Sequence, residues 1–176
     1  MLLPLQPLRL NDGTLMWAPR LLHKIEEGYT FIVAHRESLA DGASLEVLLE
    51  NPSGSGRTVH IVIIRCVGAG EGTIEIYRGV TVTTSGSSLT PVNLKIGCPI
   101  TSVCSAEYGG TYDVSGAERY VDDVLPGGTI VRAVGDAAEV GENVVLEPNN
   151  NIMVRLTNVS GTTKNFSIKI VWWEET

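Results

Sequence analysis

The sequence has few of the residues that build reactive centres or nucleic-acid-binding surfaces. Its 176 residues include only three histidines and three cysteines, and 13 Lys and Arg stand against 20 Asp and Glu, which gives a formal net charge of −7. Proteins that bind DNA or RNA usually cluster basic residues, which displace counterions from the phosphates. Here the basic residues are scattered, so we expect no nucleic-acid partner.

The cysteines and histidines show no metal-binding spacing. Structural zinc sites use two close cysteine pairs or a Cys/His quartet, and because neither occurs we expect no metal and no cofactor. Cys66 lies in an apolar run, which is typical of a small buried side chain. Cys98 and Cys104 flank a short loop, and their spacing is compatible either with free thiols or with a disulfide bridge.

Long apolar segments are also lacking. No run approaches the roughly 18 apolar residues that a membrane-spanning helix needs. Residues 1–10 are apolar, but Pro4 and Pro7 interrupt them and no charged segment precedes them, unlike in a signal peptide. We therefore expect a soluble protein with no membrane partner.

The usual enzyme signatures are missing as well. The sequence contains neither a Gly-x-Ser-x-Gly nucleophile motif nor a His-Glu-x-x-His metalloprotease motif. His35 and His60 lie in two predicted strands and could meet on neighbouring strands, but catalysis or metal binding would need a carboxylate beside them, such as Glu37 or Asp41. We favour histidines that are half-buried in a sheet or at an interface, and we expect no enzyme and no catalytic residues.

What the sequence does contain is a series of β-strand patterns separated by turn residues. Apolar residues make up 43% of the chain, and its 19 glycines suit a compact β-rich domain with many tight turns. We expect residues 73–82 to form one long bent strand and residues 83–90 an exposed loop, whereas residues 91–128 show no clear pattern. The other predicted strands cover residues 29–35, 45–49, 59–67, 129–134, 143–146, 152–157 and 166–172.

The final strand has the clearest alternation. Its predicted inner face holds Phe166, Ile168, Ile170 and Trp172, and its outer face holds Asn165, Ser167 and Lys169. Residues 59–67 are apolar on both faces, which predicts a strand that is covered on both sides. About eight strands at spacings of 8–15 residues indicate an all-β fold, a single jelly-roll-like β-sandwich over residues 29–176.

Residues 1–28 differ from this domain and are expected to form an N-terminal arm. Its apolar residues, among them Leu5, Leu8, Leu10 and Trp17, lie among prolines and are costly to leave in water. Either the arm packs on an adjacent subunit, as in a closed homo-oligomer with a trimer favoured, or it folds over its own sandwich. The alternation points Trp173 away from the core, so this side chain is a further candidate for a subunit contact.

The C-terminal third resembles the ending of a known kind of protein. Residues 146–161 include a Leu-Glu-Pro-Asn turn and Arg155-Leu-Thr-Asn158-Val-Ser-Gly161, and the final strand ends in a Trp pair and an acid. This arrangement resembles small virion proteins of tailed phages of the capsid decoration or cementing type, over residues 25–176 in order. The resemblance implies a β-sandwich structural protein that binds the major capsid protein on the exterior of the capsid.

Two other functions stay open at the level of the sequence. A carbohydrate- or receptor-binding β-sandwich module would need an exposed aromatic platform. A β-sandwich enzyme would need a cluster of histidines and carboxylates.

Overall fold

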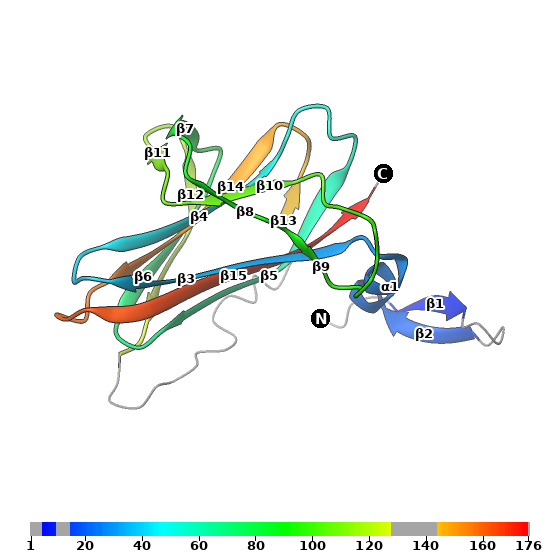
Figure 1. Cartoon of the computed structure of the whole chain (residues 1–176), viewed down its shortest axis with the longest axis horizontal. Coiled ribbons are helices and arrows are strands. Elements are labelled where there is room, and N and C mark those ends of the chain that lie inside the picture. The colour runs from blue at the N-terminus through cyan, green and yellow to red at the C-terminus, as the bar shows by residue number, and fades with distance from the viewer. Residues whose placement is uncertain (1–4, 10–14, 128–143, 176) are drawn as a thin grey trace.

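Two antiparallel sheets packed face to face form the body of the protein (Figure 1). The computed structural model describes residues 5–9, 15–127 and 144–175, and it describes side chains from Leu21 onward within these ranges. One sheet has six strands in the order β12 (Glu118–Leu125), β6 (Gly72–Arg78), β14 (Asn150–Asn158), β4 (Ser44–Asn51), β10 (Ser105–Tyr108) and β8 (Ser87–Leu89). The other has five strands in the order β13 (Val144–Leu146), β5 (Thr58–Gly68), β15 (Lys164–Glu175), β3 (Thr30–Leu39) and β9 (Val92–Asn93).

The order of the strands identifies the sandwich as a jelly roll. Four consecutive strands, β3, β4, β5 and β6, come first in the chain. The later strands β12, β13, β14 and β15 pair with them antiparallel and in the reverse order. Thus β3 pairs with β15, β4 with β14, β5 with β13 and β6 with β12, as in a long hairpin rolled into two sheets. The all-β, jelly-roll prediction is therefore confirmed.

The core lies between the two sheets, where alternate residues of each strand meet. In β15 the four residues predicted to face inward are at most 1% exposed: Phe166, Ile168, Ile170 and Trp172. Asn165 is exposed, and Ser167 and Lys169 are half-buried, so the predicted alternation is confirmed. Every residue of β5 is buried or half-buried, which agrees with a strand covered on both sides.

A second, smaller apolar cluster lies on the outer face of the six-stranded sheet. Leu48 and Met153 project from β4 and β14, away from the main core. A two-stranded sheet covers them; it consists of β7 (Thr81–Thr84) and β11 (Thr111–Asp113) and contributes Tyr112. This cover explains why Leu48 interrupts the polar face of β4 with a side chain that is only 2% exposed.

The structure corrects two predicted segments. Residues 73–82 do not form one bent strand, because the chain breaks at Gly79, where φ is +71°, a value that favours glycine. The residues before the break belong to β6, and those after it belong to β7 in a different sheet. The loop predicted at residues 83–90 contains β8, which pairs with β10. The strand predicted at residues 129–134 lies outside the described residues.

Two asparagines within residues 146–161 have structural roles. The Asn158 side chain is fully buried and donates hydrogen bonds to the carbonyls of Leu39 and Thr162, at 2.9 and 2.8 Å. Asn151 both donates to and accepts from the backbone of Val80, which fixes the start of the segment that covers Leu48. These amides hold the ends of strands, so this part of the pattern supports the fold itself.

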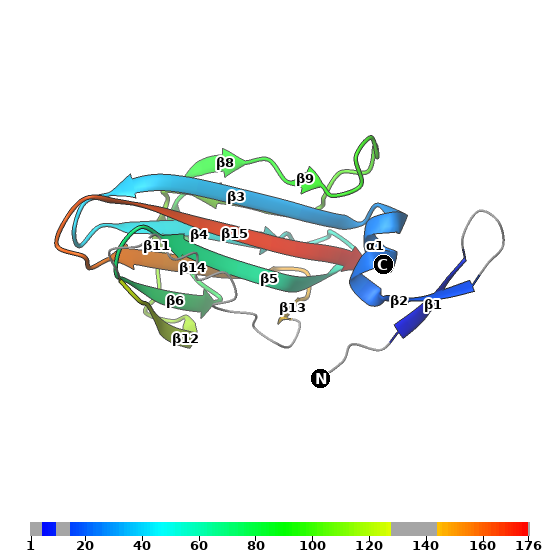
Figure 2. The ribbon, with the colours of Figure 1, turned by 90° about the horizontal axis from the view of Figure 1, so that it is seen from below.

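The N-terminal arm divides into two parts (Figure 2). Residues Leu5–Arg9 (β1) and Leu15–Pro19 (β2) form a two-stranded antiparallel ribbon that joins neither sheet of the sandwich. The helix α1 (Arg20–Glu27) follows directly and lies against the end of the jelly roll, beside the C-terminal end of β15. In the described part of the chain, no helix is long and apolar enough to cross a membrane.

Candidate functional site

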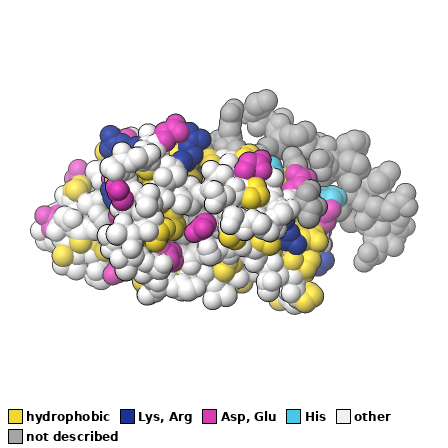
Figure 3. Space-filling view, turned by 90° about the horizontal axis from the view of Figure 1, so that it is seen from above, with side chains coloured by type: hydrophobic (Ala, Val, Ile, Leu, Met, Phe, Trp, Pro, Cys, Tyr) yellow, Lys and Arg dark blue, Asp and Glu magenta, His cyan; other side chains and the backbone are white. Residues whose placement is uncertain are grey.

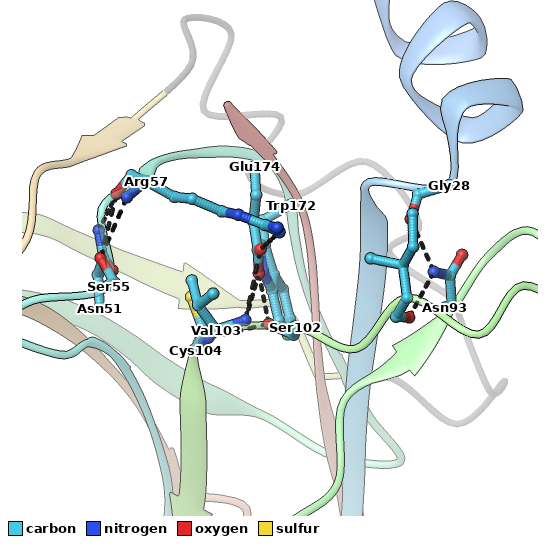
Figure 4. A network of polar contacts seen from close by, with 11 residues as sticks. Gly28, Asn51, Ser55, Arg57, Asn93, Ser102, Val103, Cys104, Trp172 and Glu174 are labelled. Carbon is cyan, nitrogen blue, oxygen red and sulfur yellow. Dashed lines mark hydrogen bonds and ion pairs between the residues drawn. The ribbon is translucent and has the colours of Figure 1, made fainter. Parts of the chain in front are cut away.

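The candidate site is the end of the sandwich that carries α1 and the ribbon. The last residues of β15, the first residues of β3 and the start of β5 meet here, together with the loops around residues 93–104. Figure 4 shows the polar contacts that hold these segments together. We build the site outward from its most buried charge.

A fully buried carboxylate lies at the centre of this end. Glu174 follows Trp172 by two residues, so it shares the inward face of β15, and its side chain is 0% exposed. The Arg57 guanidinium donates to Oε2 at 2.8 Å, and the Ser102 hydroxyl donates to Oε1 at 2.5 Å. The Val103 amide and the Trp172 indole N–H also donate to Oε1, at 3.1 and 3.3 Å. We call Glu174 and these four donors the Glu174 network.

The Glu174 network is closed rather than open to a ligand. A carboxylate has about four acceptor positions, and here four donors from three different segments surround it. Glu174 also lines a small cleft of about 180 Å³, together with Lys24, Tyr29, Arg57 and Glu175. The carboxylate therefore ties β15, the start of β5 and the 101–104 loop to one another.

The opposite face of β15 supports α1. Trp173 stacks on His60 with ring centroids 3.7 Å apart and the planes 7° from parallel. The Lys24 ammonium of α1 lies 5.3 Å from the centre of the Trp173 ring and 3.8 Å from the Glu175 carboxylate. Cation–π and charge contacts thus connect α1 to the sheet.

The C-terminal end of α1 is bound to a second loop. Gly28 ends the helix with φ at +83°, and its carbonyl accepts a hydrogen bond from the Asn93 side chain at 2.8 Å. The same amide group donates to the carbonyl of Ile100 at 3.0 Å (Figure 4). A Cβ at Gly28 would lie 2.5 Å from the Cys98 sulfur, so the loop approaches the helix end too closely for a larger residue.

The predicted subunit-contact residues fall into two groups. Trp173 lies on the face opposite Trp172, as predicted, yet it is only 1% exposed, because residues of its own chain cover it. Leu5 and Leu8 lie in β1, and Trp17 lies in β2; their side chains, and Leu10 as a whole, lie outside the described residues.

The two strand histidines do not meet. Both His35 on β3 and His60 on β5 flank β15, but they pair at different heights, beside Ile168 and Trp173 respectively. Ile168 faces the core and Trp173 the opposite side, so the histidines lie on different faces of the sheet. His35 stacks on Tyr108 at 3.6 Å, and both histidines are half-buried in the sheet, as we favoured. Among the described residues, no group of three His, Cys, Asp or Glu side chains could hold a metal ion.

A second polar cluster occupies the outer face of the six-stranded sheet. Arg155 donates to Glu46 at 2.6 Å and lies 3.6 Å from Glu75, which also accepts from Arg119 at 2.8 Å. Burial alone would raise the pKa of Glu75, but hydrogen bonds from Arg119 and Tyr77 and the charge of Arg155 outweigh it and lower the pKa. The positive and negative charges compensate one another, so this cluster has a structural role and links the strands β4, β14, β6 and β12.

The cysteines and the aromatic rings bear on two alternatives that the sequence left open, a disulfide between Cys98 and Cys104 and an exposed aromatic platform for a carbohydrate. Cys98 and Cys104 are free in the structure, and burial raises the pKa of the Cys104 thiol to about 12. In the part of the chain whose side chains are described, every Trp, Tyr and Phe is buried or half-buried. The tryptophan pair of β15 therefore provides no exposed platform for a sugar.

Sequence reasoning missed the Glu174 network, although a signal was present. The alternation that placed Phe166, Ile168, Ile170 and Trp172 in the core continues to Glu174, which predicts a carboxylate on the inner face. A buried charge needs a charged or hydrogen-bonding partner. The identity of that partner could not be predicted, because Arg57 and Ser102 are distant in the sequence.

Comparison with known proteins does not assign the chain to a family. Its sequence matches no protein-family model, and no curated protein is detectably similar to it.

Proposed function

We propose that this chain is a structural protein of a tailed-phage virion, a decoration or cementing protein that binds the major capsid protein on the outside of the shell. In this proposal the chain acts as a homo-oligomer, with a trimer favoured. The N-terminal arm provides the contacts between copies.

The observation that carries the proposal is the position of the β1–β2 ribbon. It pairs only with itself and joins neither sheet of the jelly roll. A lone two-stranded hairpin is marginally stable in water, and stable ribbons pack against a third strand, a helix or another surface. Eight of the ten residues in the two strands are Leu, Met, Trp, Ala or Pro, namely Leu5, Pro7, Leu8, Leu15, Met16, Trp17, Ala18 and Pro19. Beyond its own two strands, the ribbon contacts chiefly the short helix α1, and a neighbouring subunit would supply the rest of the surface.

Three further features support the same function. The jelly roll is a fold that viral capsid proteins use, although lectin domains use it too. The sequence pattern of residues 146–161 resembles small phage virion proteins. The net charge of −7 suits a particle that faces solvent and does not bind the packaged nucleic acid.

The test of assembly compares the full chain with residues 20–176. The deletion stops before α1, because Lys24 of this helix contacts Trp173 and Glu175 of the sandwich. Size-exclusion chromatography with light scattering should give an oligomer for the full chain and a monomer for the truncated chain, with unchanged β-sheet circular dichroism. A truncated chain that keeps the full oligomeric mass would show that the arm is not the assembly device.

The test of location uses intact virus particles. Antibodies against residues 20–176 should label the outer surface of intact particles from the host that produces this chain, as seen by immuno-electron microscopy. Labelling that appears only after the particles are disrupted would overturn a position on the capsid exterior.

A further inference from the structure

A small cleft lies on the outer face of the six-stranded sheet, beside the two-stranded sheet of β7 and β11. Its volume is about 220 Å³. Its floor comes from β4, β10 and β8, where Leu48, Glu107 and Ser88 pair side by side across the three strands. Further lining residues are Glu50, Val82, Ser85, Gly86 and Ser105. We call it the carboxylate cleft, because Glu50 and Glu107 are the only charged residues in its described lining.

The walls of the carboxylate cleft are a fixed part of the fold. Val82 of β7 packs on the apolar cluster around Leu48. A Cβ at Gly86 would overlap the carbonyl oxygen of Tyr108, so only glycine lets this segment approach β10 so closely. Clefts that hold drug-sized ligands have volumes of roughly 300–1,000 Å³. The carboxylate cleft is smaller, and its size suits a single side chain of a partner protein.

The two carboxylates of the cleft have no compensating charge. Glu46 and Glu75 on the same face of the sheet pair with arginines, whereas neither carboxylate of the cleft forms an ion pair with a described residue. The Oε1 atom of Glu107 is buried and has no hydrogen-bond partner in the protein. Burial, and next the charge of Glu107, raise the pKa of the Tyr112 hydroxyl. A buried acceptor without a donor is unfavourable, so the cleft lacks a positively charged hydrogen-bond donor.

The lining favours an arginine or lysine side chain as that donor. Leu48 and Val82 offer an apolar surface to an alkyl stem, and the carboxylates and serine hydroxyls accept hydrogen bonds from the charged head. A calcium ion instead takes about six to eight oxygen ligands. Among the described residues, no group of three His, Cys, Asp or Glu side chains could hold a metal ion.

The surrounding surface has the same sign of charge as the cleft. Figure 3 views the molecule from the side of β7 and β11, and acidic side chains lie in the middle of this face. The described Lys and Arg side chains lie nearer its upper left and its right-hand side. This distribution favours a partner with a basic surface.

We propose that the carboxylate cleft binds an arginine or lysine side chain of the major capsid protein and is a point of attachment to the shell. The identity of the partner rests on the proposed function. None of the described lining residues belongs to the ribbon or to α1, so attachment to the shell and contacts between copies use separate surfaces.

The first test uses the purified full chain and n-propylguanidinium chloride, which represents an arginine side chain. Saturation-transfer difference NMR should show saturable binding to the unmodified chain. Glu107→Gln and Glu50→Gln keep the shape of the side chain and remove its charge, so each should weaken binding by roughly tenfold or more. Glu71→Gln, at an exposed glutamate outside the cleft, is the control and should bind like the unmodified chain. The β-sheet circular dichroism should be the same in all four chains.

The second test fills the cleft from within the chain. Ser88 is exposed and pairs directly with Glu107, so the guanidinium of Ser88→Arg can reach the cleft and should abolish binding of n-propylguanidinium. Particles of a virus that encodes Ser88→Arg should carry at most about a tenth of the usual amount of this chain, measured by quantitative mass spectrometry. Ser87→Arg is the matched control, because Ser87 is also exposed but points to the opposite face of β8. Its particles should keep the usual amount.

The outcomes separate this inference from the proposed function. No saturable binding of n-propylguanidinium, or equal binding by the unmodified chain and both Gln variants of the cleft, overturns the site. Binding of CaCl₂ in its place, lost in the same Gln variants, would make the cleft a metal site and also overturns it. If antibodies label intact particles but Ser88→Arg particles keep their full content, the proposed function stands and this inference fails. If n-propylguanidinium binds but the particles are not labelled, the proposed function fails, and the capsid protein is not the source of the basic side chain.

Discussion

Removing the buried carboxylate of Glu174 should destabilise the jelly roll far more than removing that of its neighbour Glu175. In Glu174→Ala, the Arg57 guanidinium, the Ser102 hydroxyl and two further donors lose their acceptor. Breaking a fully buried ion pair on one side costs about 3–5 kcal/mol. The Arg57 side chain is 21% exposed and regains some water, so we expect a loss of about 2–4 kcal/mol in the free energy of unfolding.

Glu175→Ala is the matched control, one residue along the same strand. Its side chain is 39% exposed and lies 3.8 Å from Lys24 and 3.5 Å from His60. Ion pairs with this much solvent contact contribute about 0–1 kcal/mol. The two substitutions remove the same group, so the difference between them measures what burial and the four donors add.

Urea unfolding followed by tryptophan fluorescence measures both variants, at one fixed protein concentration because assembly would also stabilise the fold. For a chain of this size, the expected loss in Glu174→Ala lowers the melting temperature by roughly 4–16 °C. If Glu174→Ala and Glu175→Ala unfold within about 1 kcal/mol of each other, the Glu174 network does not hold this end of the sandwich, and the reasoning fails.

Three more predictions test the core and the thiols. Phe166→Ala should lower the free energy of unfolding, measured in urea, by about 3–5 kcal/mol, because the ring is 1% exposed between the sheets. Asn165→Ala on the exposed face should lower it by about 0.5 kcal/mol or less. Equal losses in the two variants would contradict the assigned faces. In the native protein at pH 8, Ellman's reagent should modify half-buried Cys98 first, because burial raises the pKa of both Cys66 and Cys104 to about 12. Fast modification of all three thiols would refute this. An unfolded thiol has a pKa near 8.5, so the unfolded chain releases these protons first and stability should fall as the pH rises from about 8.5 towards 12. Removing one of these thiols in Cys66→Ala should make this fall smaller. An equally steep fall of the urea midpoint in Cys66→Ala and in the unmodified chain would contradict it.

Four strands of the five-stranded sheet, all except β9, could be predicted because each carries its own evidence. In β15 the alternation of Phe166, Ile168 and Ile170 with polar neighbours fixes both the strand and its inner face. The short strands between residues 81 and 113 carry no such evidence. Their apolar residues, such as Tyr112, pack on Leu48 of a distant strand, so their faces are defined only once that strand is in place.

The site was harder to predict than the fold for the same reason. The alternation correctly separates Trp172 from Trp173, but it does not show that His60 and Lys24 cover Trp173 on the other side. Burial of an outward side chain depends on elements that come from other parts of the chain. The carboxylate cleft is likewise defined only once β4, β7, β8 and β10 have come together.

The rolled-hairpin topology also sets the order in which the domain can form. The last strand, β15, lies in the middle of its sheet, with β3 on one side and β5 on the other. On the ribosome, β3, β4, β5 and β6 therefore emerge long before their partners, and their apolar faces stay uncovered until β12, β13, β14 and β15 have been synthesised. Such long-range pairing slows folding and exposes intermediates to aggregation. Loss of the twelve residues of β15, Lys164–Glu175, would leave β3 and β5 without the strand that joins them, so the nascent domain can close only after β15 has been synthesised.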